Sequence, residues 1–219
     1  MKLLLILAFS FLVIGCATQG IVDGTVPSSS DTTAVVIPPT SGRIPLYWEN
    51  TTAPHPERKP WTDAIHTNTD KYFTMYDSAK DATRFCPKYK SLSVDLKKKA
   101  IGELLVAIAF YESGYNPKSE AVDVGTKNDK GSWSVGLYQM SGNDGAAKAL
   151  KVDYLGLKDP VKNINVAMYQ FNTQIKNTGL WILPNTSKYR YWAVALDGNK
   201  YSKVPEILAR VKKYAPGCN

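Results

Sequence analysis

Residues 100–112, AIGELLVAIAFYE, decide how the rest of the chain is interpreted. Apolar side chains recur there with the 3.6-residue period of one helix face: Ile101, Leu104, Leu105 and Ile108. At about 100° per residue, Glu112 continues this apolar face, whereas Glu103 points to the opposite side. A carboxyl group on a buried face loses solvation, which raises its pKa and lets it donate a proton near neutrality. Glu112 is therefore the candidate catalytic acid. The alternative is a helix-end carboxylate in a salt bridge or a cap.

Two motifs follow this predicted amphipathic helix. Residues 113–117, SGYNP, end the helix, because glycine and an Asn-Pro pair both stop helical propagation. About two dozen residues later stands GLYQ, at residues 136–139. In this order and spacing, ESGYNP and GLYQ resemble the two signature segments of the lytic transglycosylases of the soluble (SLT) type and of their goose-type lysozyme relatives. The resemblance covers roughly residues 85–214.

The resemblance implies a mainly α, lysozyme-like fold with a small β-hairpin beside an active-site cleft, and a lyase that cleaves the glycan strands of peptidoglycan. Glu112 would protonate the oxygen between N-acetylmuramic acid and N-acetylglucosamine. It would then take the proton of the C6 hydroxyl, which closes a 1,6-anhydro ring without water. Ser113 and Gln139 match family positions that hydrogen-bond the sugar near the cleavage point, and Tyr138 would line the same cleft. A helix-end hydroxyl and loop packing are the structural alternatives for these three residues.

One family signature is missing from the chain. Ala-Tyr-Asn, usual near the C-terminus of the family domain, does not occur. The nearest match is RYWA at residues 190–193, in which Tyr191 would supply a hydroxyl near Glu112. Residues 170–172, QFN, are a weaker contender. The missing asparagine affects how the substrate is positioned rather than the class of reaction.

Two other functions use the same residues. A hydrolytic muramidase would keep Glu112 but use water as the acceptor, with Asp123 or Asp129 as the base; Asp144 is a third nearby carboxylate. A non-catalytic peptidoglycan-binding lipoprotein would hold the outer membrane to the cell wall. Product analysis separates the first two functions, because hydrolysis leaves a reducing end and transglycosylation leaves a 1,6-anhydro end.

Several classes of function are disfavoured by composition. The chain has two histidines, His55 and His66, both in its poorly patterned N-terminal part, so a histidine triad or metal cluster is hard to assemble. It has neither a phosphate-binding P-loop nor a dinucleotide fingerprint, and no metal or cofactor is expected. The formal charge of +8 favours anionic partners such as cell-wall polymers or phospholipids. The export signal described next argues against nucleic acid.

The N-terminus predicts an exported lipoprotein. Residues 1–15 have one lysine followed by a short apolar run, which is typical of a secretory signal peptide. LVIGC, at residues 12–16, resembles a bacterial lipobox, so Cys16 is expected to be acylated; a plain signal peptide is the alternative. Ala17, in place of aspartate, implies sorting to the outer membrane of the bacterial envelope, facing the periplasm. Residues 16–43 read as a lipidated, disordered tether, and residues 44–219 as the catalytic domain with a helical extension over 44–84.

If Cys16 carries lipid, two cysteines, Cys86 and Cys218, remain in an oxidising compartment. This even remainder suggests one disulfide, with two unpaired buried thiols as the alternative. Turn residues dominate between 118 and 135 and predict a hairpin or a glycine-rich loop. Further helices are expected from periodicity and proline positions, over residues 61–68, 69–77, 160–175, 189–196 and 205–213.

Overall fold

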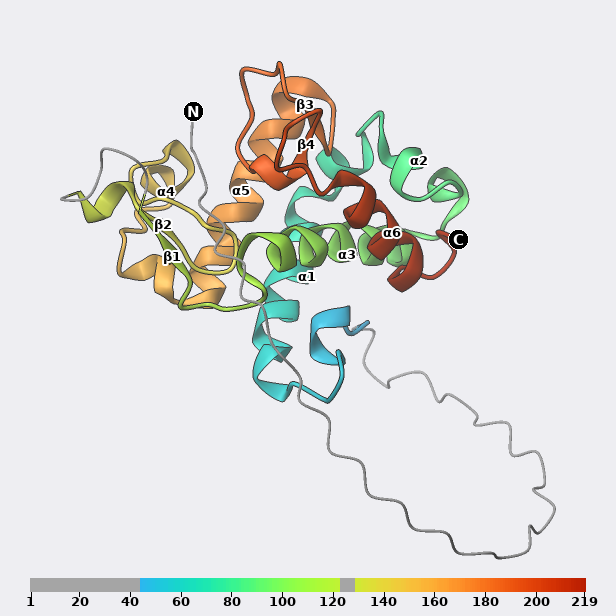
Figure 1. The fold of residues 1–219 in the computed structure, drawn as a ribbon. Coiled ribbons are helices and arrows are strands. Elements are labelled where there is room, and N and C mark those ends of the chain that lie inside the picture. The colour runs from blue at the N-terminus through green and yellow to red at the C-terminus, as the bar shows by residue number, and fades with distance from the viewer. Residues whose placement is uncertain (1–43, 123–128) are drawn as a thin grey trace, which may run out of the picture. The chain divides into compact units, whose positions relative to one another are not determined.

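The computed structural model describes residues 44–122 and 129–219, and helices dominate this part of the chain (Figure 1). The signal peptide at 1–15, the lipidation site Cys16, the tether at 16–43 and the candidate base Asp123 lie outside the described residues. The α-helices are α1 (Lys59–Asp77), α2 (Ala82–Phe85), α3 (Val94–Ser113), α4 (Gly145–Ala149), α5 (Pro160–Thr178) and α6 (Val204–Tyr214). Short 3-10 turns lie between them, at Tyr47–Glu49, Pro56–Arg58, Tyr89–Ser91, Lys130–Ser132, Gly156–Lys158 and Ala193–Ala195.

Two small sheets complete the fold. β1 (Glu120–Ala121) pairs antiparallel with β2 (Ser134–Val135), so the hairpin predicted between residues 118 and 135 is confirmed. β3 (Leu183–Pro184) pairs in parallel with β4 (Leu196–Asp197), which the sequence did not predict. The mainly α fold with a small hairpin is likewise confirmed.

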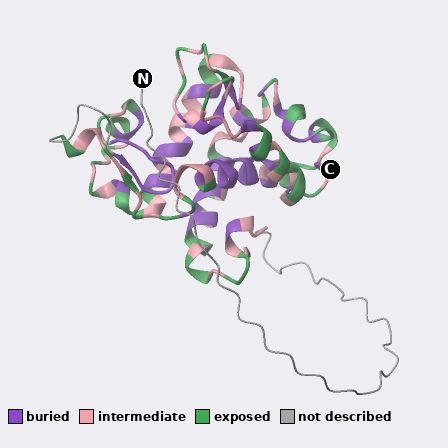
Figure 2. Cartoon of the chain, in the orientation of Figure 1, coloured by how far each residue is buried: buried purple, intermediate pink, exposed green. Residues whose placement is uncertain are grey.

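Helix α3 lies at the centre of the described residues and packs against α1 and α6. Figure 2 shows it as a buried element along most of its length. Every residue from Lys99 to Ala109 is buried, including Glu103 on the side predicted to face solvent. The amphipathic interpretation of this helix is therefore wrong. A helix that is apolar nearly all round is typically a core helix, and Glu103 interrupts an otherwise unbroken run from Ala100 to Phe110.

Helix α3 also begins earlier than predicted, at Val94 rather than at residue 100. Its N-cap is Ser93, whose hydroxyl accepts a hydrogen bond from the N–H of Leu96 at 3.4 Å. Serine is one of the preferred N-cap residues because it satisfies an otherwise unpaired N–H group in the first turn. The lysine run at 97–99 therefore belongs to the helix.

The five further helices that the sequence predicts have clear outcomes. Residues 61–77 form one continuous helix, α1, instead of two short ones. The helix expected over 189–196 is absent; only Ala193–Ala195 form a 3-10 turn, and the indole N–H of Trp192 donates to the Tyr138 carbonyl at 2.9 Å. A distant partner thus holds this segment outside a helix, against its local propensity. The helices expected at 160–175 and 205–213 are confirmed as α5 and α6.

The disulfide between Cys86 and Cys218 is present, as the sequence predicted. It joins the residue after α2 to the penultimate residue of the chain, with Cα atoms 4.3 Å apart and a sequence separation of 132 residues. Among the helices within residues 44–122 and 129–219, none is both long and apolar enough to span a bilayer.

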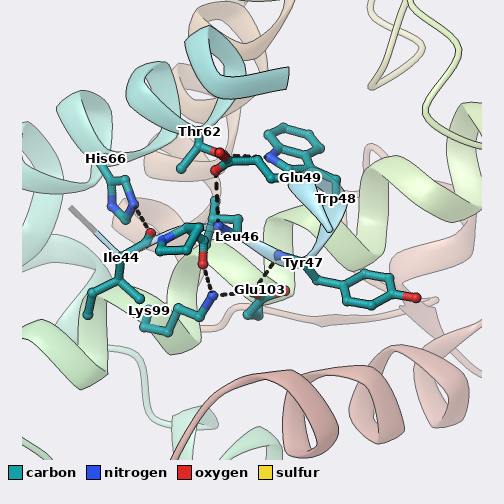
Figure 3. Close-up of polar contacts among 10 residues, drawn as sticks. Ile44, Leu46, Tyr47, Trp48, Glu49, Thr62, His66, Lys99 and Glu103 are labelled. Carbon is teal, nitrogen blue, oxygen red and sulfur yellow. Dashed lines mark hydrogen bonds and ion pairs between the residues drawn. The ribbon is translucent and has the colours of Figure 1, made fainter. Parts of the chain in front are cut away.

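The start of the folded part, residues 44–49, is bonded to the middle of α3 (Figure 3). The ammonium group of Lys99 donates to the Pro45 carbonyl, and it pairs with the Glu103 carboxylate at 2.7 Å. The same carboxylate accepts the N–H of Tyr47 at 2.9 Å. Lys99 and Glu103 are 6 % and 2 % exposed, so this is a buried ion pair. It ties residues 44–49 to α3, and Leu46 and Trp48 of this segment are buried in the core.

Candidate active site

Glu112 lies in the last turn of α3, and its side chain is half-buried. Gly114 follows at φ 62°, and its N–H donates to the Phe110 carbonyl at 2.8 Å. This left-handed conformation favours glycine and ends the helix directly after the carboxylate, as the sequence predicted. The residues before Phe110 are enclosed by the core, so Glu112 stands where α3 emerges from it. The raised pKa expected for Glu112 stays a prediction.

Tyr191 and Asp144 form a hydrogen-bonded pair beside Glu112. The Tyr191 hydroxyl donates to a carboxylate oxygen of Asp144 and accepts the N–H of Ser141 at 3.3 Å. The same Asp144 oxygen accepts the Ser141 N–H at 3.0 Å. Burial, then the charge of Asp144, and to a smaller extent the charge of Glu112, raise the pKa of Tyr191 well above its ordinary value. The hydroxyl group therefore stays protonated, close enough to Glu112 to feel its charge.

The weaker contender for this tyrosine position is not at the site. Residues 170–172 belong to α5, and Phe171 is fully buried against Tyr76, with ring centroids 5.2 Å apart.

Ser113 ties the end of α3 to the loop containing GLYQ. Its hydroxyl lies 3.1 Å from the Ala109 carbonyl and 2.9 Å from the Leu137 carbonyl, and it can donate to either. A serine at a helix end commonly bonds the carbonyl four residues back, but the contact with Leu137 is a tertiary one. The structure thus gives Ser113 a positioning contact. The predicted contact with sugar stays a prediction.

Gln139 is 5 % exposed, and its amide nitrogen donates to the carbonyls of Ser119 at 3.2 Å and Gly136 at 2.9 Å. The residue has φ 48°, a conformation that non-glycine residues rarely adopt. The amide thus closes the loop around the end of the hairpin. A bond from Gln139 to the sugar stays a prediction.

Tyr138 does not line the cleft. Its side chain is fully buried, and its hydroxyl donates to the Leu105 carbonyl in the middle of α3 at 3.1 Å. The expectation that Tyr138 contacts substrate is therefore wrong. The large ring fills space in the core, and the Leu105 carbonyl provides the hydrogen-bond partner that a buried hydroxyl group requires.

Asn163 on α5 was missed by the sequence analysis and holds the GLYQ loop in place. It is fully buried; its amide nitrogen donates to the carbonyls of Val135 at 2.8 Å and Leu157 at 3.1 Å, and its oxygen accepts the Tyr138 N–H at 2.9 Å. Gly136 allows Asn163 to approach the backbone of the loop this closely. A Cβ added there would lie 2.5 Å from the Asn163 amide nitrogen, and its φ is 77°. An asparagine within the apolar face of a predicted helix was the available signal.

We expect Asn163→Ala to lower the free energy of unfolding by about 2–4 kcal/mol, because two carbonyls and one N–H lose their buried partner. Urea unfolding of the two proteins measures this difference. Asn177→Ala on the same helix is the matched control, since the Asn177 amide bonds an exposed carbonyl of its own helix. A cost for Asn163→Ala no larger than that of the control would contradict the role of this residue.

The other candidate carboxylates have different positions. Asp129 is exposed and caps its own loop, accepting bonds from the Gly131 N–H at 3.0 Å and the Ser132 hydroxyl at 2.5 Å. The bond from Ser132, followed by those from Gly131 and the Asn143 amide, lowers the pKa of Asp129. Asp144 is the described candidate that lies next to Tyr191, on a cavity of about 580 Å³. Within the described ranges, no three His, Cys, Asp or Glu side chains form a group that could hold a metal ion.

Comparisons with known proteins agree with the motifs. Residues 94–190 match the family described as "Transglycosylase SLT domain". Among solved structures, Bd0314 DslA in its wild-type form 2 has a TM-score of 0.67 and 23% sequence identity, and the match covers 82% of this chain and 100% of that one. A Glu-to-Gln mutant of the same protein gives the same values, and a second such mutant has 22% identity. At these identities the likeness shows the fold alone. No curated protein sequence matches the chain.

Proposed function

Starting from the lysozyme-like transglycosylase SLT domain that this chain contains at residues 94–190, we propose that the protein cleaves the β-1,4 bond between N-acetylmuramic acid and N-acetylglucosamine, with 1,6-anhydromuramoyl ends as the product. The SLT domain supports the coarser activity, that of a lytic transglycosylase acting on peptidoglycan glycan strands. The finer proposal rests on one observation above all. Glu112 stands at the exposed end of a buried helix, beside the hydrogen-bonded pair of Tyr191 and Asp144.

Glu112 acts first as an acid and then as a base. Its carboxyl proton moves to the oxygen that joins the two sugars while the bond from this oxygen to muramoyl C1 breaks. The oxygen of the muramoyl N-acetyl group assists at C1. Glu112, now a carboxylate, then removes the proton of the C6 hydroxyl, and the C6 oxygen attacks C1. The ring closes without water, and Glu112 is protonated again.

The surrounding residues suit this exchange of one proton. A residue that alternates as acid and base works best with a pKa near neutrality. The negative charge of Asp144 is expected to disfavour the carboxylate form of Glu112, since the charges of both residues act on Tyr191. Tyr191 donates its own proton to Asp144 and accepts the Ser141 N–H, so both bonds fix the position of its hydroxyl group. Ser113 bonds the Leu137 carbonyl and Gln139 bonds the Ser119 carbonyl. Contacts of these two residues with the sugar are part of the proposal.

The product decides between the proposed reaction and hydrolysis. The protein is incubated with purified peptidoglycan, and the soluble fragments are divided into two samples. One sample is reduced with borohydride, and both are analysed by mass spectrometry. The expected muropeptides carry 1,6-anhydro ends, which have no reducing end and resist borohydride. Reducible ends would instead assign the protein to the hydrolases, and binding without cleavage would assign it to the wall-binding lipoproteins.

We expect Asp144→Asn to lower the rate of strand cleavage by about tenfold and to move the alkaline limb of the pH–rate profile to lower pH. Asparagine keeps the acceptor oxygen for Tyr191 but removes the charge that favours protonated Glu112. The charged groups around this position are Glu112, Asp144 and, on the cavity wall, Arg190 and Lys200. A pH profile that does not move, even with a lower rate, would limit Asp144 to a structural role.

We further propose that the protein is anchored in the outer membrane, facing the periplasm, by a lipid on Cys16. The lipobox-like LVIGC at residues 12–16 and Ala17 support this. Cys16→Ser is expected to move the protein from the membrane fraction to the soluble fraction of envelope preparations, since the acyl chains supply the affinity for the bilayer. Immunoblots of the two fractions measure the shift. Retention of the variant in the membrane would exclude lipidation at Cys16 as the anchor.

A further inference from the structure

The cavity that Tyr191 lines is formed by three segments. Asp144 precedes α4, Asn185 and Arg190 belong to the segment after β3, and Lys200 and Tyr201 follow β4. Its volume is about 580 Å³, large enough for several amino-acid residues of a peptide. Tyr191 lies in its wall, and the charge of Glu112 acts on the same tyrosine, so the cavity is near the candidate acid.

The charge of the cavity favours an anion. The Arg190 guanidinium donates to the Asn185 carbonyl at 2.9 Å, and the Lys200 ammonium lies 4.8 Å from the centre of the Tyr201 ring. In the part of the chain that the structure describes, neither cation is in an ion pair. The carboxylate in the wall, Asp144, is already bonded by Tyr191 and by the Ser141 N–H. Two cations and one carboxylate therefore line the cavity, so the charge of its wall is positive.

The chemistry of the proposed substrate provides such an anion at this place. The peptide stem of peptidoglycan is attached through a lactyl group to C3 of the muramoyl residue, the sugar whose C1 reacts at Glu112. The stem carries carboxylates and branches off from the glycan strand. A cavity with Tyr191 and two cations in its wall suits such a branch.

We propose that this cavity binds the anionic peptide stem of the muramoyl residue that is cut, with Arg190 and Lys200 contacting stem carboxylates. The inference rests on the proposed function and makes it more specific: the preferred substrate is a glycan strand that carries its stems. The guanidinium group provides a fixed fork for a carboxylate, and the lysine provides a mobile point charge. The two asparagines beside them, Asn185 and Asn199, bond each other at 3.0 Å and hold this wall in place.

The first test compares two substrates. Initial rates are measured on intact peptidoglycan and on the same strands after an amidase has removed the stems. Wild type is expected to cut intact strands about tenfold faster, as charge-assisted contacts of this kind contribute about that factor. In Arg190→Gln/Lys200→Gln, most of this preference should disappear, whereas Lys176→Gln/Lys212→Gln, with the same change in net charge at distant exposed positions, should retain it. Equal rates of wild type on the two substrates would overturn the proposal.

The second test does not depend on turnover. Calorimetry with Glu112→Gln measures binding of a soluble disaccharide with a tetrapeptide stem, of the disaccharide alone, and of inorganic phosphate. The stem is expected to tighten binding about tenfold, and the two cavity substitutions should abolish this gain. Equal affinity with and without the stem, or equally tight binding of phosphate, would overturn the stem site. Failure of the proposed function would give a different result: wild type would cleave neither form of the glycan.

Discussion

Replacing Glu112 with glutamine is expected to lower the rate of strand cleavage by about 10²- to 10⁴-fold, the range in which one general acid–base group contributes. Glutamine has nearly the same shape as glutamate but can neither donate a carboxyl proton nor take one from the C6 hydroxyl. Because one residue performs both steps in the proposed reaction, no other carboxylate among the described residues compensates for its loss. Release of soluble muropeptides from peptidoglycan, measured over time, gives the two rates.

The control for this experiment is Glu206→Gln, the same chemical change in an exposed ion pair with Lys203 on α6. Both variants should unfold at the temperature of wild type within a few degrees. Glu112→Gln should also still bind glycan strands, so that the loss lies in the chemical step. If it kept a tenth or more of the wild-type rate, Glu112 would not be the acid, and Asp144 would become the first candidate to test.

The second large effect concerns the ion pair that holds residues 44–49 against α3. Glu103→Ala is expected to lower the free energy of unfolding by about 3–5 kcal/mol, because Lys99 remains buried without its counter-charge. The substitution also removes the acceptor of the Tyr47 N–H. Burial raises the pKa of Glu103, and Lys99 and the Tyr47 N–H oppose this shift. Urea unfolding followed by tryptophan fluorescence measures the difference, since Trp48 lies in the segment that the pair holds.

A double variant separates the charge from the packing. Lys99→Met/Glu103→Leu replaces both charges with apolar side chains of similar size, and it should be far more stable than Glu103→Ala, close to wild type or above it. Glu206→Ala, which breaks an exposed pair, should cost less than about 1 kcal/mol. If the double variant were as unstable as the single one, the loss would come from packing or from the Tyr47 N–H, which loses its acceptor in both variants, rather than from an unpaired charge.

The predictions that the structure confirms rest on local signals. The hairpin around residues 118–135, the proline-initiated helices α5 and α6, and the end of α3 after Glu112 each depend on residues a few positions apart. A glycine in a left-handed conformation or a proline in a first turn acts within its own segment. The disulfide is the exception, since it joins distant residues but followed from counting cysteines.

The predictions that were wrong concern which surface of an element meets which partner. Glu103 was placed on the solvent side of α3, although α1, α6 and residues 44–49 cover that helix. Tyr138 was placed in the cleft, although its hydroxyl reaches the Leu105 carbonyl. A helical segment was expected around Trp192, whose indole bonds a residue 54 positions away. Contacts over such sequence separations leave no periodic trace, because both partners look unremarkable in their own segments.

By itself, then, the sequence determined the family resemblance, the helix that ends at Glu112 and the loop that follows it, because spacing and stop signals are properties of the local chain. Only the tertiary structure decided between Tyr191 and residues 170–172, and between Asp144 and Asp129, as neighbours of the site. Asp144 and Tyr191 are 47 residues apart, and Ser141 joins them through its backbone N–H. Likewise, Asn163 meets the GLYQ loop only when α5 packs beneath it. The packing of the core brings these side chains together. The sequence of any one segment does not indicate which distant residues it will contact.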